Sequence, residues 1–333
     1  MAIQGMNVLV TGAGGFVGSH LVQELLARGA KVRAFLRYTS EGNIGMLRYL
    51  AEEERAALEL HYGDLRDADA VLAAARGMSA IIHLGALIGI PYSFAHLREV
   101  LAVNVQGTLN VLQAARAHGS LRVIHASSSE VYGSAQTVPI GERHPLNAQS
   151  PYAASKTAAD QLVGSFRAAF DLPTVILRPF NTYGPRQSTR AVIPAILTQA
   201  LAGGPIRLGA LHPTRDFTYV EDVVAGYCLA LESDAALGRS LNLGTNREIR
   251  IAELARQILE LVGRGDEIDS AILARDEARL RPGSSEVDRL RADAAAARAV
   301  LGWEAAVPLE EGLRRCIDWY REHGDSLTGK YRI

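Results

Sequence analysis

The stretch VTGAGGFVGSHL, residues 10–21, decides the fold of this chain. It follows the apolar run NVLV and continues into a helical pattern that extends to Gly29. Glycines at this spacing, between a strand and a helix, allow a tight turn, let the backbone approach a pyrophosphate, and leave room for close helix packing. The positive end of the helix dipole favours the same anion. The stretch therefore predicts dinucleotide binding by Gly12, Gly15, Phe16, Val17 and Gly18.

Short apolar or β-branched runs alternate with longer helical patterns through the first half of the chain. The runs lie at residues 7–10, 31–36, 58–62, 80–84, 122–127 and 174–178. Alternation of this kind predicts parallel strands joined by right-handed crossovers, with helices on both faces of the sheet. We therefore expect an α/β fold with a Rossmann-type doubly wound parallel sheet.

The regular alternation ends at Pro179. Residues 180–216 are rich in Gly, Pro and Arg, whereas residues 217–233 resume with a strand end and a helix. We interpret this pattern as one domain interrupted by another. The dinucleotide-binding domain is expected at residues 1–178 and about 217–246, and a smaller C-terminal substrate-binding lobe at about 179–216 and 247–333.

The composition argues against several classes of protein. Of the 333 residues 48% are hydrophobic, and the formal net charge is −1, so neither a basic nucleic-acid surface nor a disordered acidic tail is indicated. Cys228 and Cys316 have no CxxC pattern or histidine-rich neighbours, which predicts buried free thiols and no metal site. No signal peptide or membrane span is recognisable. We expect a cytoplasmic protein whose partners include neither nucleic acid nor membranes.

The end of the second expected strand bears on the choice of dinucleotide. An NAD-selective site normally has Asp or Glu there, to hold the ribose hydroxyls. This chain instead reads Phe35-Leu36-Arg37-Tyr38-Thr39-Ser40. Arg37 could receive a 2′-phosphate, or it could stack on an adenine or face solvent. The cofactor is therefore expected to be NAD or NADP, with a slight preference for NADP.

Lysine is rare in this chain. Only positions 31, 156 and 330 carry it, among 35 lysines and arginines in total. A chain that prefers arginine is expected to keep lysine where a compact ammonium is needed. Lys156 follows Tyr152 by four residues, so on a helix the two share a face, and the cation is predicted to lower the pKa of the phenol toward the range of a general acid or base. The alternative is a surface helix with an unrelated tyrosine.

Several motifs must be considered together with this pair. They are Gly12-x-x-Gly15-x-x-Gly18, Ser127-Ser128-Ser129-Glu130-Val131-Tyr132-Gly133, Tyr152-Ala153-Ala154-Ser155-Lys156, and the later stretches NTYGPRQSTRAVIP, HPTRDFTYV and RLRPGSSEV. Over its full length the chain resembles the extended short-chain dehydrogenase/reductase family, the NAD-dependent epimerases and dehydratases, which act mostly on nucleotide-diphosphate sugars. It looks most like the nucleotide-sugar 4,6-dehydratases, especially the branch acting on GDP- or UDP-N-acetylglucosamine in legionaminic-acid-type pathways.

The resemblance implies a role for each residue of the catalytic group. Ser128 and Tyr152 would bond the 4-hydroxyl of the sugar, Tyr152 acting as base, while Lys156 would hold the nicotinamide ribose. Glu130 would remove the C5 proton before water leaves from C6, and a tightly bound cofactor would be recycled. Ser129 stands where the dTDP-glucose branch has an aspartate that acts as acid, so the proton donor to the departing water is open. Glu130 could instead cap a backbone amide.

The resemblance also implies binding residues outside the catalytic group. Those expected at the cofactor are Arg37, Asp64 on the adenine amine, Leu65 on the ring, Leu84, Ala86 and Pro179. Those expected at the substrate are Ser128, Asn181 and three arginines that would hold the diphosphate: Arg190, Arg215 and Arg281. Asn104 is interpreted as ordering a helix kink, and His83, His96, His125 and His144 as structural.

Three alternatives remain open from the sequence. The resemblance extends to 4-epimerases, for which the glutamate would be dispensable, and to UDP-glucuronate decarboxylases, in which an arginine would meet the C6 carboxylate. A protein that keeps the fold as a dinucleotide-binding scaffold or sensor is the non-enzymatic alternative. The family also implies a homodimer, formed through the helices after Asn104 and after Tyr152.

Overall fold

A seven-stranded parallel sheet forms the centre of the computed structural model, which describes residues 2–267, 271–274 and 282–324. The strand order is β11-β6-β5-β4-β1-β2-β3. The strands are β1 (Asn7–Thr11), β2 (Lys31–Arg37), β3 (Glu59–Gly63), β4 (Ala80–His83), β5 (Arg122–Ala126), β6 (Thr174–Pro179) and β11 (Ser240–Leu243). The order reverses between β1 and β4, where the carboxyl ends of parallel strands leave a crevice for a ligand. The predicted Rossmann-type fold is confirmed.

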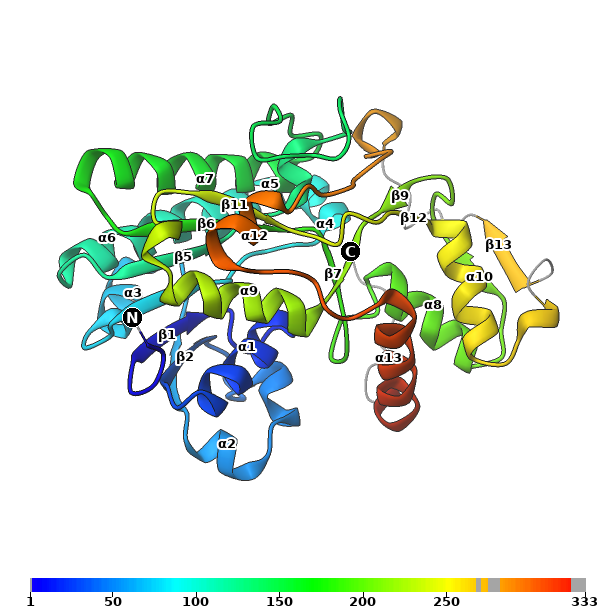
Figure 1. Ribbon diagram of the computed structural model, residues 1–333. Helices are drawn as coiled ribbons and strands as arrows, with labels where there is room; N and C mark the ends of the chain where they lie inside the picture. Colours follow the sequence, from blue (N-terminus) through cyan, green and yellow to red (C-terminus); the bar gives the residue numbers. More distant parts are fainter. Residues whose placement is uncertain (1, 268–270, 275–281, 325–333) are drawn as a thin grey trace.

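Helices cover both faces of this sheet, as Figure 1 shows. One face carries α3 (Ala68–Ala75), α6 (Gly107–Ala117) and α7 (Pro151–Phe170), and the other carries α1 (Phe16–Ala27) and α9 (Val220–Glu232). Alternate residues of β1 divide between the two cores: Leu9 packs with Val111 and Val163, whereas Val8 and Val10 pack with Leu21. This alternation follows from the pleat of a strand buried on both faces.

A smaller group of elements lies beside the sheet, at the right of Figure 1. It contains α8 (Val192–Leu201), β8 (Ile206–Leu208), α10 (Ile251–Leu261), β13 (Ile272–Ala274) and α13 (Leu309–His323). Two short pairings connect it to the rest, β7 (Asn181–Tyr183) with β10 (Phe217–Tyr219), and β9 (Thr214–Arg215) with β12 (Ile249–Arg250). Further short elements include η1 (Gly45–Tyr49), α2 (Glu52–Ala56), η4 (Asp234–Ala236), η5 (Gly265–Glu267) and η7 (Gly283–Ser285).

The segment around α12 (Ala295–Leu301) packs against the sheet domain. Trp303 is buried and donates its indole N–H to the carbonyl of Asp222 in α9, at 2.7 Å. The carboxylate of Asp222 accepts from the backbone N–H groups of Ala306 and Val307. The sequence assigned this segment to the lobe, and the predicted domain boundaries stay a prediction.

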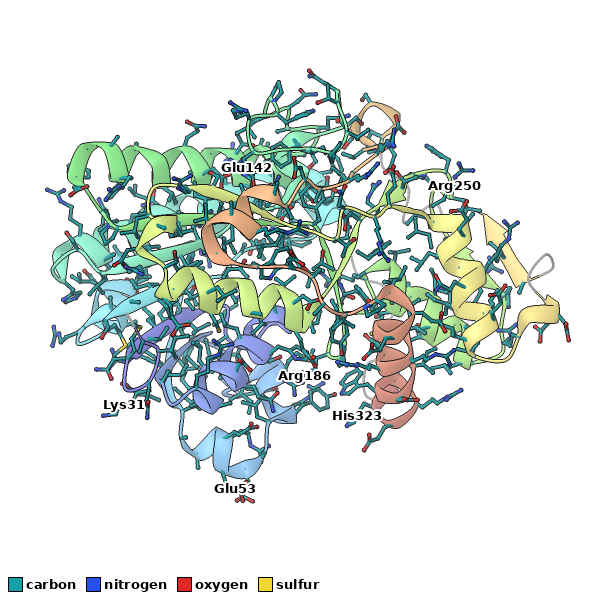
Figure 2. All side chains as sticks on the ribbon, viewed as in Figure 1. Lys31, Glu53, Glu142, Arg186, Arg250 and His323 are labelled. Atoms are coloured by element: carbon teal, nitrogen blue, oxygen red, sulfur yellow. The ribbon has the colours of Figure 1, made fainter. Side chains whose placement is uncertain are left out.

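Side chains fill the space between these ribbons (Figure 2), and Arg186 is labelled there at the junction of the sheet domain with α13. It adopts a left-handed backbone, φ 66°, and donates to Gln23 in α1. Cys228 and Cys316 are buried free thiols, as predicted. Among the described residues no helix is long and apolar enough to span a membrane, and no group of three or more His, Cys, Asp or Glu is placed to hold a metal.

Candidate active site

The glycine-rich loop closes tightly beneath the amino end of α1. Gly12 has φ 72°, and a Cβ there would lie 2.8 Å from the backbone nitrogen of Gly85. A Cβ on Gly18 would lie only 2.1 Å from the carbonyl oxygen of Gly12. Gly15 is the N-cap of α1 and offers no side chain to its amides. Backbone N–H groups at an uncovered helix N-terminus fit a dinucleotide pyrophosphate.

The other predicted cofactor residues lie at the carboxyl ends of the neighbouring strands. Arg37 ends β2, opposite Gly63 in β3, and Leu84 follows β4 and donates to the carbonyl of Thr11. A Cβ on Gly85 would meet the side chain of Leu65 at 2.7 Å, so Leu65 closes on the loop. The sheet thus brings together residues at the carboxyl ends of β1, β2, β3 and β4. Ala86 follows β4, and Pro179 is the last residue of β6.

Asp64 is already engaged by a neighbour. Arg66 donates to both of its carboxylate oxygens, with Nε 2.9 Å from Oδ1. That hydrogen bond holds the pKa of Asp64 below its ordinary value, although partial burial opposes the shift. The predicted contact of Asp64 with an adenine amine stays a prediction, and it would have to be shared with Arg66.

Two elements carry the predicted catalytic residues. The short turn η3 (Ser129–Tyr132) follows β5, and the hydroxyl of Ser128 caps it by accepting from the N–H of Glu130, at 3.2 Å. Helix α7 begins at Pro151, with the Ser150 hydroxyl accepting from Ala153 as its cap. Tyr152 and Lys156 lie one turn apart on α7 and are buried, as are Ser129 and Glu130.

The pKa values of the pair differ from the sequence-based expectation. Burial raises the pKa of Tyr152 to about 12; a hydrogen bond with Ser128 lowers it, and the charges of Glu130 and Asp160 raise it further. Burial lowers the pKa of Lys156 to about 8, against the attraction of Asp160. The Lys156 ammonium donates to the carbonyl of Ala126. The prediction that Lys156 lowers the pKa of Tyr152 is therefore wrong for this structure, because desolvation dominates and the ammonium faces a carbonyl.

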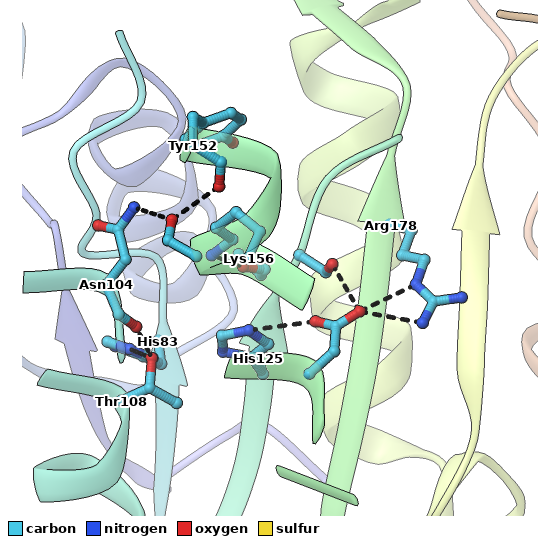
Figure 3. A network of polar contacts seen from close by, with 11 residues as sticks. His83, Asn104, Thr108, His125, Tyr152, Lys156 and Arg178 are labelled. Atoms are coloured by element: carbon cyan, nitrogen blue, oxygen red, sulfur yellow. Dashed lines mark hydrogen bonds and ion pairs between the residues drawn. The ribbon is translucent and has the colours of Figure 1, made fainter. Parts of the chain in front are cut away.

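Behind this pair lies a buried polar network, shown in Figure 3. Asp160, one further turn along α7, accepts from Arg178 at 3.0 and 3.1 Å and from the hydroxyl of Ser127 at 2.9 Å. His125 faces its other oxygen at 3.5 Å, and burial followed by the charge of Lys156 lowers the pKa of His125 to about 4. The sequence interpretation missed Asp160. Its signal was an acid at the buried i+4 position from Lys156.

A second row of hydrogen bonds runs from the glycine-rich loop to α7. Thr108 donates to the carbonyl of Asn104, so its oxygen must accept from Nε2 of His83, at 3.0 Å. Nδ1 of His83 is then an acceptor and receives the hydroxyl of Thr11, at 2.7 Å. Asn104 lies in η2 (Ala102–Gln106), a π-helical turn at the predicted kink, and its amide donates to Ser155.

The predicted substrate residues other than Ser128 lie on separate segments of the chain. Asn181 begins β7, and its side-chain oxygen is buried without a hydrogen-bond partner among the described residues. Arg215 is buried and paired with Glu286, at 3.2 Å. Arg190 lies near Gly89, at the start of α4 (Ile90–Ala95), and its charge acts on Tyr92. Arg281 lies outside the described residues.

Known proteins share this organisation along the chain. Residues 9–316 match the family model described as GDP-mannose 4,6 dehydratase. A UDP-glucose 4-epimerase of Mycolicibacterium smegmatis is 36% identical over 322 residues, which cover 95% of this chain and 99% of that protein. The crystal structure of DesIV, a dTDP-glucose 4,6-dehydratase from Streptomyces venezuelae with NAD bound, has a TM-score of 0.87 at 31% identity, covering 97% of this chain and 99% of that one. MoeE5 in complex with UDP-glucuronic acid and NAD has a TM-score of 0.82 at 33% identity, covering 95% and 99%.

The family match spans most of the chain, and the relatives are aligned over nearly their whole lengths. The same chain places a glycine-rich loop at the switch point of the sheet and a Tyr-x-x-x-Lys pair on the adjacent helix. From the fold, the site and these likenesses together, the chain belongs to the extended short-chain dehydrogenase/reductase family of NAD-dependent nucleotide-sugar epimerases and dehydratases.

Proposed function

We propose that this enzyme is an NAD(P)-dependent nucleotide-sugar 4,6-dehydratase. The observation that carries the proposal is the position of Glu130, a buried carboxylate on η3 close enough to Tyr152 to raise the pKa of its phenol. Its neighbour Ser128 is hydrogen-bonded to Tyr152. A carboxylate base beside the residues that act on C4 is what elimination requires after C4 has been oxidised, because the C5 proton must then be removed.

The chain's residues divide the reaction between them. Tyr152 takes the proton of the sugar's 4-hydroxyl, which Ser128 orients, and Lys156 would hold the nicotinamide ribose. When bound, a nicotinamide dinucleotide would supply a hydride acceptor for C4 and a hydride donor for C6. Glu130 removes the C5 proton, which the 4-ketone has made acidic, and the C6 hydroxyl takes up one proton and leaves as water, so one H and one OH are lost in all. The product is a 4-keto-6-deoxy sugar, with no net oxidation.

The variant Glu130→Gln tests this role. We expect it to reduce bound cofactor with substrate, because Tyr152 and Lys156 are intact, but to lose at least about a hundredfold in exchange of the C5 hydrogen with solvent and in loss of water. Glu253→Gln, at an exposed position of helix α10, is the control and should match the wild type. Unchanged dehydration by Glu130→Gln would remove Glu130 from the mechanism.

Two other reactions of the family have specific support. The 36% identical relative in Mycolicibacterium smegmatis is named a UDP-glucose 4-epimerase. MoeE5 was solved with UDP-glucuronic acid. In this chain Arg215 is paired with Glu286, so Arg215 would have to exchange that carboxylate for the carboxylate of a uronate. The product masses separate the three: water lost, mass unchanged, or carbon dioxide lost.

The nucleotide, the sugar and the cofactor belong to the proposal. Asn181, Arg190, Arg215 and Arg281 are proposed to hold a nucleotide-diphosphate sugar, and the branch acting on GDP- or UDP-N-acetylglucosamine stays a prediction. NAD has support from the NAD-bound relatives. NADP rests on Arg37 and on the absence of an acid at the end of the second strand, and mass spectrometry of the cofactor released from purified protein decides between the two.

We also propose a cytoplasmic homodimer, formed through α6 and α7, the helices after Asn104 and Tyr152; exposed apolar residues lie on α4 and α5 (Leu97–Leu101), which pack against α7. Phe94 on α4, and Leu97 and Leu101 on α5, are 40%, 47% and 39% exposed. Grouped apolar side chains of this size on a surface favour an interface. Sedimentation of the wild type should give twice the monomer mass, and Leu97→Glu with Leu101→Glu should halve it. A monomeric wild type would contradict the dimer.

A further inference from the structure

We propose that Asp160 is a positioning residue that holds the turn bearing Ser128 and Glu130 in register with Tyr152 and Lys156. The inference rests on the proposed function and deepens it. It concerns how two catalytic elements that are separate in the sequence are kept at a fixed distance. The evidence is a continuous set of buried hydrogen bonds that starts at one carboxylate.

Helix α7 presents Tyr152, Lys156 and Asp160 at intervals of four residues, and all three are buried. Asp160 is therefore attached to the same rigid face as the proposed base and its lysine. Its Oδ2 atom accepts from the Ser127 hydroxyl at 2.9 Å. Ser127 directly precedes Ser128, so this bond fixes the amino end of the catalytic turn to α7.

The carboxyl end of the turn is reached through Arg178. Its Nε and Nη2 atoms donate to the same Oδ2 atom of Asp160, at 3.1 and 3.0 Å. Its Nη1 atom donates to the hydroxyl of Tyr132, at 3.0 Å, and that hydroxyl donates to Asn242 in β11, at 2.8 Å. Tyr132 is the last residue of η3. The residues on both sides of Ser128 and Glu130 are thus tied to one carboxylate.

These hydrogen-bonded residues can hold η3 in place because they are buried. Asp160 is 2% exposed, Arg178 5%, and Tyr132 and Asn242 0%. Breaking a buried ion pair leaves a charge without compensation, so displacement of either partner is strongly opposed. Positioning matters at this site because a misplacement of about 1 Å can lower a rate by about a hundredfold.

Two mild variants test the inference without removing a charge. Ser127→Ala releases one end of the turn, and Tyr132→Phe releases the other while keeping the ring. Tyr320→Phe is the matched control, because Tyr320 is a buried tyrosine of α13 whose hydroxyl donates to Gln187. The readouts are single-turnover reduction of bound cofactor, exchange of the C5 hydrogen with deuterium oxide, KM, and thermal unfolding.

For each mild variant we expect cofactor reduction to fall by roughly tenfold and C5 exchange to fall further, with KM unchanged and the control like the wild type. In an Asp160→Asn background, adding Tyr132→Phe should cost at most about twofold more, since the two act through one group. Wild-type rates in both mild variants, or full additivity with Asp160→Asn, would overturn the inference. Cofactor reduction also occurs in an epimerase, so this test stands even if product mass shows no loss of water.

Discussion

Gly18 shows how little freedom single positions have in this site. A Cβ there would lie 2.1 Å from the carbonyl oxygen of Gly12, a backbone atom that cannot yield without moving the loop. Gly164, also helical, has nothing within 4 Å of the corresponding position. Gly18 is therefore required by a close backbone contact, whereas the structure leaves room for a side chain at Gly164, although both glycines lie in helices.

The variant Gly18→Ala should lower the free energy of unfolding by about 3 kcal/mol or more, because the turn must open to admit the Cβ. It should also bind the dinucleotide much more weakly than the wild type. Gly164→Ala is the control and should raise the free energy of unfolding by about 0.5–1 kcal/mol, as expected for alanine in a helix. Urea unfolding and a cofactor titration measure both. Wild-type affinity in Gly18→Ala would contradict the close contact.

Residues with local signatures could be predicted from the sequence, and residues defined by distant partners could not. The spacing of Gly12, Gly15 and Gly18 and of Tyr152 and Lys156 is readable along the chain. The pairing of Asp160 with Arg178 depends on which strands adjoin α7. The wrong pKa direction for Tyr152 has the same origin, since burial is a property of the whole fold and outweighs one neighbouring charge.

At the scale of elements, α9 is the support on which the C-terminal segment rests. The Asp222 carboxylate accepts from Ala306 and Val307 at 3.0 and 3.1 Å, and its carbonyl accepts from the indole of Trp303. The periodic strands and helices of the sheet domain were predictable because they are long and regular. The pairs β7–β10 and β9–β12 have only two or three residues per strand, too few for a pattern.

The variant Asp222→Ala should lower the free energy of unfolding by about 1–3 kcal/mol, because two part-buried hydrogen bonds lose their charged acceptor. Asp318→Ala on α13 is the control: its ion pair with Arg321 is exposed and 3.7 Å long, so the change should stay within about 0.5 kcal/mol. Thermal and urea unfolding give the comparison. Equal effects from the two variants would show that Asp222 does not anchor the segment.

At the scale of the whole molecule, three histidines with lowered pKa values contribute to the response to acid. Burial, with the charge of Arg186, lowers the pKa of His20 to about 4, and burial with Lys156 lowers that of His125 to about 4. Burial also brings the pKa of His83 well below its ordinary value of 6.5. All three are neutral in the folded protein over a range in which the unfolded chain binds protons.

The contribution of these three histidines to the free energy of unfolding should therefore be constant above about pH 6.5. It should decrease as the pH falls from 6.5 toward 4. The slope approaches about 1.4 kcal/mol per pH unit for each histidine. The variant His20→Gln, which keeps a donor for the carbonyl of Pro185, should remove up to one proton from this slope. Urea unfolding at a series of pH values measures it, and a stability that rises on acidification through this window would contradict the prediction.

The hydrogen bonds of His83 also have a direction. A hydroxyl or an imidazole can point either way, but the row that contains Thr11, His83 and Thr108 begins at the N–H of Gly85, which can only donate, and ends at the carbonyl of Asn104, which can only accept. Two main-chain groups thus orient every reversible dipole between them. A proton added to Nδ1 of His83 would take away the acceptor of the Thr11 hydroxyl. The polarity beneath the glycine-rich loop is therefore set by the backbone, and it persists as long as β1, β4 and α6 stay in place.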